Sequence, residues 1–132
     1  MGHEPPVAKA TNISDQVEIV SLHPGEFLFR EGDPGDALYI VNSGLLRIVS
    51  GSTVYETVKP GGIVGEMAIV EHGLRRSASV IAGTRAELTR IDMNQFLARV
   101  TNTPDFSLQV MRVMARRLRV MNRRYRREQD EP

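Results

Sequence analysis

Short apolar runs separated by turn residues fill the chain from Val17 to Ile91 and leave no stretch there for a long helix. Gly, Pro, Asn and Asp lie between the runs, and each cluster favours a tight turn because Gly adopts positive φ angles and Pro presets the first turn angle. Short strands at this regular spacing predict an all-β sandwich or a barrel-like roll. The expected strands cover residues 17–20, 26–29, 37–41, 45–50, 53–58, 78–82 and 86–91.

Two helices are expected after the strands. Asp92 is a suitable N-cap for a helix over residues 92–101, and the segment up to Pro104 ends that helix. Apolar side chains recur every three to four positions over residues 105–127, which predicts a second and longer helix. The expected organisation is a flexible segment over 1–14, a single domain over 15–127 and a tail over 128–132.

The composition argues against an enzyme. The chain has no cysteine, which excludes disulfides, a thiolate metal site and a catalytic thiol. Its three histidines are scattered and form no His-x-His pair, so a metal-dependent β-roll enzyme of the cupin type would lack its ligands. No apolar run near the N-terminus is long enough for a signal peptide or a transmembrane segment, so a cytoplasmic location is expected.

Charge is distributed unevenly along the chain. The first 111 residues carry nine cations against thirteen acids, whereas eight arginines and no acid lie between Arg112 and Arg127. A basic helix of this kind attracts nucleic acid, anionic lipid or an acidic protein surface, unless it is only a solvated face. Too few residues follow Arg127 for a helix-turn-helix, so a protein effector would act in trans unless the chain is a fragment.

Heptad spacing in the last helix bears on self-association. Three pairs of apolar residues are seven positions apart, which is compatible with a coiled-coil seam in a homodimer. These pairs are Val113 and Val120, Met114 and Met121, and Leu118 and Tyr125. Arg117 and Arg124 interrupt the seam, and a helix laid back across the roll would use the same stripe, so both arrangements stay open.

The segment from Gly65 to Val80 carries the chemistry of the chain. Gly65 lets the backbone approach a ligand, the next residues can form one or two helical turns, and a helix N-terminus offers free N–H groups to an anion. Arginine presents a planar guanidinium that binds phosphate in a way that lysine cannot reproduce. Successive residues of an extended segment alternate sides, so only one of Arg75 and Arg76 can face the ligand. The segment therefore predicts a phosphate-binding site.

This segment resembles the ligand-binding cassette of cyclic nucleotide-binding domains, specifically their catabolite-activator branch, without the DNA-binding domain of that branch. The matching residues are Gly65-Glu66 and, at the spacing of the family, Arg76-Ser77-Ala78-x-Val80. The resemblance continues through His23-Pro24-Gly25-Glu26, the run from Phe29 to Val41, Pro104-Asp105-Phe106 and Met114-Ala115-Arg116-Arg117-Leu118. The fold that it implies is mainly β with flanking helices: an antiparallel, jelly-roll-like β-roll with a short cassette helix and two C-terminal helices.

The resemblance also implies a set of ligand-binding residues. It selects Arg76 over Arg75 as the phosphate ligand, with Ser77 as a second donor to phosphate. Glu66 would accept a hydrogen bond from the ribose 2′-hydroxyl, unless it only stabilises the start of the helix. Arg117 would pair with Glu66, unless it lies on a solvated edge of its helix. The complete expected set is Gly65, Glu66, Met67, Ala68, Arg76, Ser77, Ala78, Arg117, Met121 and Asn122.

The base is expected to be read from the last helix, where a gapless comparison with the family places Met121 and Asn122 over the purine. Asn122 both donates and accepts, which suits the adenine edge, while Met121 is an adaptable apolar cover. Cyclic AMP is therefore favoured over cyclic GMP, which stays open because the family usually has small hydroxyl residues here and this sequence departs from it at the position that discriminates the base. No other cofactor is expected.

The function that follows is a stand-alone regulatory module. Cyclic nucleotide binding would reposition the C-terminal helix and so signal to a protein partner. A β-roll that has lost ligand binding and serves only as an interaction scaffold is the alternative, and the presence of Glu66 and Arg76 argues against it.

Overall fold

The computed structural model describes residues 17–71 and 73–130. The chain divides into two compact units, the first ending at Ala98 and the second starting at Arg99. The flexible segment predicted over 1–14 lies outside the described residues, and the prediction of a single domain over 15–127 stays a prediction.

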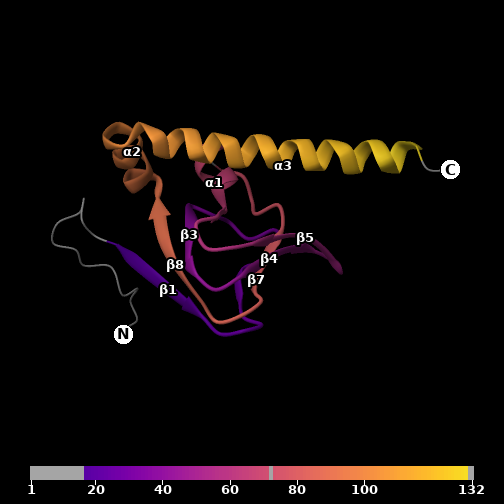
Figure 1. Ribbon diagram of the computed structural model, residues 1–132, viewed down its shortest axis with the longest axis horizontal. Helices are drawn as coiled ribbons and strands as arrows, with labels where there is room; N and C mark the ends of the chain where they lie inside the picture. The colour runs from indigo at the N-terminus through magenta and orange to yellow at the C-terminus, as the bar shows by residue number, and fades with distance from the viewer. Residues whose placement is uncertain (1–16, 72, 131–132) are drawn as a thin grey trace. The chain divides into compact units, whose positions relative to one another are not determined.

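Two four-stranded antiparallel sheets make up most of the first unit (Figure 1). One has the strand order β1-β8-β3-β6, and the other has the order β2-β7-β4-β5. The strands are β1 (Glu18–Leu22), β2 (Phe27–Phe29), β3 (Ala37–Ser43), β4 (Leu46–Ser50), β5 (Thr53–Val58), β6 (Ile63–Val64), β7 (Ser79–Ala82) and β8 (Ala86–Asp92). The seven predicted strands are all present, whereas β6 was not predicted because two residues are too few to show an alternating pattern.

The apolar core lies between the two sheets. Its buried cluster draws on both of them: Leu22, Val41, Val64, Ala86 and Leu88 come from the first sheet, and Leu46, Val58, Val80 and Ala82 come from the second. In β8, Ala86 and Leu88 are buried while Glu87 between them is exposed, which is the two-residue period of a strand with one buried face. This is the mainly β, antiparallel arrangement that the sequence predicts.

Three helices occur in the described residues: α1 (Glu66–Val70), α2 (Met93–Asn102) and α3 (Pro104–Asp130). They correspond to the predicted cassette helix and the two predicted C-terminal helices. α3 ends at Asp130, three residues beyond the predicted end at 127, and no Gly or Pro interrupts the helix before it. The predicted tail over 128–132 otherwise stays a prediction. Within the part of the chain that the structure describes, no helix is long and apolar enough to span a membrane.

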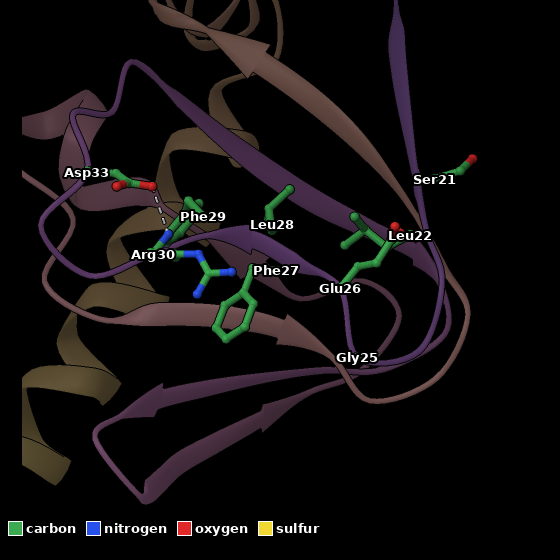
Figure 2. A pocket seen from close by; sticks show the side chains of 9 residues that line it. All are labelled: Ser21, Leu22, Gly25, Glu26, Phe27, Leu28, Phe29, Arg30 and Asp33. Carbon is green, nitrogen blue, oxygen red and sulfur yellow. Dashed lines mark hydrogen bonds between the residues drawn. The ribbon is translucent and has the colours of Figure 1, made fainter.

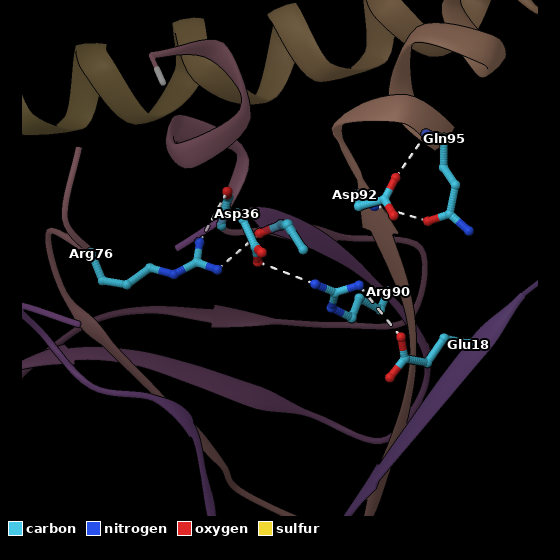
Figure 3. A network of polar contacts seen from close by, with 8 residues as sticks. Glu18, Asp36, Arg76, Arg90, Asp92 and Gln95 are labelled. Atoms are coloured by element: carbon cyan, nitrogen blue, oxygen red, sulfur yellow. Dashed lines mark hydrogen bonds and ion pairs between the residues drawn. The ribbon is translucent and has the colours of Figure 1, made fainter. Parts of the chain in front are cut away.

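Asp92 caps α2, as predicted. Its Oδ1 accepts a hydrogen bond from the backbone N–H of Gln95 at 2.9 Å, and Oε1 of Gln95 accepts one from the backbone N–H of Asp92 at 2.9 Å (Figure 3). The two bonds form a capping box, which satisfies two donors that the first turn of a helix leaves unpaired.

We expect Asp92→Ala to lower the free energy of unfolding by about 1 kcal/mol, because it removes the N-cap bond. Urea denaturation followed by circular dichroism measures the loss. Asn94→Ala is the matched control, since Asn94 is an exposed residue of the same first turn. An equal loss in both variants would contradict the capping role.

Candidate ligand-binding site

Two charged side chains are buried in the described part of the chain, and both belong to the predicted cassette. Glu66, the first residue of α1, is 4% exposed, and Arg76 is 7% exposed. Taking charged groups out of water is costly, so buried ones are retained where they are paired or where they serve a site. Their positions therefore mark the candidate site.

The backbone of Arg76 is fixed by the turn that follows β2. Its N–H donates to the carbonyl of Asp33 at 2.8 Å, and the N–H of Gly32 donates to its carbonyl at 2.8 Å. The neighbouring Arg75 is exposed, and its guanidinium donates to the carbonyl of Gly32 at 3.0 Å. The two arginines therefore point to opposite sides, with Arg76 inward, as the alternation predicted.

The guanidinium of Arg76 contacts two carbonyls and one aromatic ring. Nη1 donates to Gly65 at 3.2 Å and Nη2 donates to Ala37 at 2.9 Å, and Figure 3 draws both bonds. Its Cζ lies 4.0 Å from the centroid of the Phe29 ring, which is a cation–π contact. Nε is buried and has no hydrogen-bond partner. Since buried donors are nearly always satisfied, this free N–H indicates a site for an acceptor.

The surroundings of Arg76 also favour an anion. Burial lowers the pKa of its guanidinium, and the nearby Tyr39, Asp36 and Asp33 only partly oppose this shift. A lowered pKa means that the protein disfavours the positive charge relative to water. An anion placed against Nε would both satisfy the free donor and compensate the charge.

Two glycines make room for this arginine. A Cβ added at Gly35 would overlap Nε and Cζ of Arg76, and one added at Gly65 would lie 2.8 Å from its Nη1. Gly65 also has a φ of 81°, in the left-handed region, and lies at the N-cap of α1. Gly35 has no positive φ, so its lack of a side chain matters for space alone.

Sequence reasoning missed Phe29 and Gly35 as parts of the site. It placed Gly35 in a turn and in the family-like run from Phe29 to Val41, and it placed Phe29 in a strand and in the same run, without a ligand-site role for either. Both lie more than thirty-five positions before Arg76, so only the folded chain shows the contacts. The one local signal in the sequence was the glycine that ends the predicted turn over residues 32–35.

An ion pair links the turn around Gly35 to the first sheet. Arg90 in β8 contacts Glu18 in β1 at 3.4 Å and Asp36 at 3.1 Å (Figure 3). The Asp36 side chain is 83% exposed, so its pairing contributes less than about 1 kcal/mol to stability. The contact of Arg90 with Asp36 therefore contributes little to the stability of the fold.

The remaining predicted residues of the cassette lie beside Glu66 and Arg76 in the chain. In α1, Met67 is 43% exposed and Ala68 is buried. Immediately after Arg76, Ser77 is exposed and Ala78 is half-buried. The predicted role of Ser77 as a second phosphate donor stays a prediction.

The three predicted residues of α3 belong to the second unit. Arg117 is half-buried and Asn122 is exposed, whereas the side chain of Met121 lies outside the described residues. The predicted pairing of Arg117 with Glu66 and the predicted cover over the base stay predictions.

A hollow beside β2 contains none of the predicted ligand residues, although Phe29, on which Arg76 stacks, is part of its lining. It is lined by Ser21, Leu22, Gly25, Glu26, Phe27, Leu28, Phe29, Arg30 and Asp33 (Figure 2). The guanidinium of Arg30 covers the Phe27 ring there, with Cζ 3.9 Å from its centroid. Among the described residues, Nε of Arg76 is the one buried side-chain nitrogen or oxygen without a hydrogen-bond partner, so the side chains of this hollow offer no such donor.

The comparisons with known proteins agree with this geometry. The family described as cyclic nucleotide-binding domain matches residues 19–102. The CRP-like cAMP-activated global transcriptional regulator of Mycobacterium tuberculosis is 31% identical over 126 residues, which cover 92% of this chain and 55% of that protein. The cAMP-dependent protein kinase regulatory subunit of Hypocrea atroviridis is 33% identical over 65% of this chain and 18% of its own length. The crystal structure of Thermus thermophilus catabolite activator protein superposes with a TM-score of 0.72 at 29% identity, over 83% of this chain and 53% of that chain.

The chain belongs to the cyclic nucleotide-binding domain family. The predicted resemblance and the predicted β-roll fold are both confirmed. The chain spans about half the length of the mycobacterial and Thermus regulators, so it corresponds to one part of each.

Proposed function

We propose that this chain binds a cyclic nucleotide, with cyclic AMP preferred, and acts as a cytoplasmic regulatory module rather than as an enzyme. The observation that carries the proposal is the burial of Glu66 and Arg76 within the cassette of a cyclic nucleotide-binding domain. In a scaffold that bound no ligand, apolar residues of similar volume would be as stable or more stable there. Two buried charges and a free buried donor therefore favour a ligand-binding domain over a ligand-blind scaffold.

Each cassette residue has a distinct role in this proposal. The cyclic phosphate carries one negative charge, which Arg76 binds through its free Nε–H with Ser77 as a second donor. The Glu66 carboxylate accepts a hydrogen bond from the ribose 2′-hydroxyl. The other predicted cassette residues would form the backbone and the surface next to the nucleotide: Gly65, Met67, Ala68 and Ala78.

The role of Glu66 is tested with a ligand that lacks the group it binds. The unaltered protein should bind cyclic AMP about 10 to 100 times more tightly than 2′-deoxy cyclic AMP, because a hydrogen bond to a charged group is lost. Glu66→Gln should reduce this preference to a few-fold, and isothermal titration calorimetry measures all four affinities. An unchanged preference in Glu66→Gln would remove Glu66 from ribose recognition.

Base preference is proposed to depend on α3, with Met121 and Asn122 covering the purine. Asn122→Ala should change the ratio of cyclic AMP to cyclic GMP affinity by about fivefold or more, since it removes a neutral hydrogen-bonding group. Ser77→Ala is the control, because it should weaken both nucleotides alike. Equal ratios in the two variants would contradict the assignment of Asn122.

Signal output is proposed to come from the C-terminal helix. A ligand that contacts both the cassette and Asn122 has a higher affinity for the conformation in which α3 makes that contact. Its binding therefore increases the fraction of molecules in that conformation. The effector is proposed to be a protein that binds in trans. In the predicted homodimer seam, Val113 is buried and Met114 and Val120 are half-buried within the single chain. Self-association through this seam stays a prediction.

A further inference from the structure

The exposed side of α3 carries a row of arginines that the cyclic nucleotide site does not use. The row consists of Arg112, Arg116, Arg119 and Arg123, all exposed and spaced by three or four residues. Positions at this spacing lie on one face of a helix. No acid occurs between Arg112 and Arg127, so no carboxylate of that stretch neutralises the row.

A row of exposed apolar side chains runs beside the arginines. Leu108, Met111 and Leu118 are 41%, 55% and 59% exposed, and the exposed Ala115 lies between the last two. At 3.6 residues per turn, this row is centred about 100° around the helix from the arginine row. Both rows are distinct from the buried face of Phe106, Val110 and Val113.

We propose that these two rows, which together form the α3 docking face, bind an anionic phospholipid surface with the helix lying in the plane of the interface. The apolar row would enter the boundary between headgroups and acyl chains, as it does in interfacial helices. The arginines would bind lipid phosphates, for which the guanidinium is well suited because it donates two parallel hydrogen bonds. The inference does not depend on nucleotide binding.

Charge and polarity together favour lipid over nucleic acid and over a second copy of the chain. A nucleic-acid backbone would require the arginines but would gain nothing from exposed Leu118 and Met111. A second copy docked helix to helix would cover the apolar row, but it would also bring two arginine rows together, and no acid lies between Arg112 and Arg127 to pair them. An anionic bilayer satisfies both rows at once.

Vesicle co-sedimentation with the full chain tests the proposal. The protein should bind vesicles of phosphatidylcholine mixed with phosphatidylglycerol but not vesicles of phosphatidylcholine alone, and binding should weaken as salt is added. Arg116→Gln combined with Arg119→Gln should lower the affinity about 25-fold. Each basic residue contributes about 1 kcal/mol to binding an anionic surface, and about 1.4 kcal/mol corresponds to a tenfold change in affinity. Arg47→Gln combined with Arg85→Gln removes the same charge from exposed positions of the roll and should change the affinity by less than about threefold.

The apolar row is tested separately. Met111→Ser combined with Leu118→Ser should lower the affinity for the mixed vesicles about tenfold or more, because less apolar surface is buried. Ile19→Ser combined with Val54→Ser is the matched control, since these residues are 46% and 50% exposed on the roll. Circular dichroism confirms that each variant keeps its helix content.

Several outcomes would overturn the proposal. Equal binding to neutral and anionic vesicles would remove the arginines from the interaction, and an absence of binding to either would exclude a lipid surface. Binding to duplex DNA that depends on Arg116 and Arg119 but not on Met111 and Leu118, without vesicle binding, would indicate nucleic acid. Self-association abolished by the Met111 and Leu118 changes, again without vesicle binding, would indicate a second copy.

Discussion

Arg76→Leu is expected to lower the affinity for cyclic AMP by about 10- to 150-fold, which corresponds to about 1.5 to 3 kcal/mol for a hydrogen bond to a charged group. Arg76 is buried, its Nε–H has no partner, and burial lowers the pKa of its guanidinium, so an anionic phosphate gains both a donor and a compensating charge there. Leucine keeps an apolar contact with Phe29 but offers neither a hydrogen-bond donor nor a positive charge to the phosphate. Isothermal titration calorimetry gives the affinity.

The same substitution should leave the fold intact. Replacing a buried charge with an apolar residue removes its desolvation cost, which offsets part of the loss of the bonds to Gly65 and Ala37 and of the volume that leucine does not fill. Arg75→Leu is the matched control, because Arg75 is adjacent and exposed, and it should change the affinity by less than about twofold. If Arg76→Leu also stays within about twofold while urea denaturation shows it folded, the phosphate role of Arg76 is wrong.

Gly35→Ala is expected to weaken cyclic AMP binding by about tenfold or more, although Gly35 is not expected to touch the ligand. An added Cβ would overlap Nε and Cζ of Arg76, so the guanidinium must leave its position over Phe29. A guanidinium displaced in this way loses most of the binding free energy of its hydrogen bond to the phosphate. The free energy of unfolding should fall by only about 1 to 2 kcal/mol, since the atoms that must shift belong to a side chain.

Gly83→Ala is the matched control for Gly35→Ala. A Cβ at Gly83 would also overlap a guanidinium, that of Arg47, and neither glycine has a positive φ, so backbone strain is absent from both variants. Arg47 is exposed and lies outside the cassette. Calorimetry should show a loss of affinity in Gly35→Ala alone, and equal losses in both variants would mean that Gly35 acts on the fold rather than on Arg76.

The sequence predicted those features that depend on local pattern. The turn residues around β5 define the strand at both ends, so its bounds of Thr53 and Val58 were predicted without error. Asp92 is followed three positions later by Gln95, which is the local signature of a capping box. The alternation of Arg75 and Arg76 likewise follows from an extended segment.

Features that depend on long-range contacts were not predicted. The stacking of Arg76 on Phe29 and its fit against Gly35 join the turn after β2 to a segment beyond α1, and no local periodicity reports such a contact. Strand β6 was missed because it is defined by pairing of Ile63 and Val64 with β3 rather than by its own pattern. The exposed apolar row of α3 was predicted only in part: Leu118 belongs to a predicted heptad pair, whereas Leu108 and Met111 belong to none.

The central claim is that this chain binds a cyclic nucleotide through Arg76 and Glu66, and calorimetric titration of the unaltered protein with cyclic AMP and cyclic GMP tests it most directly. The account predicts saturable binding of one nucleotide per chain, with cyclic AMP bound more tightly than cyclic GMP. Failure of both nucleotides to bind the folded protein at millimolar concentration would contradict it.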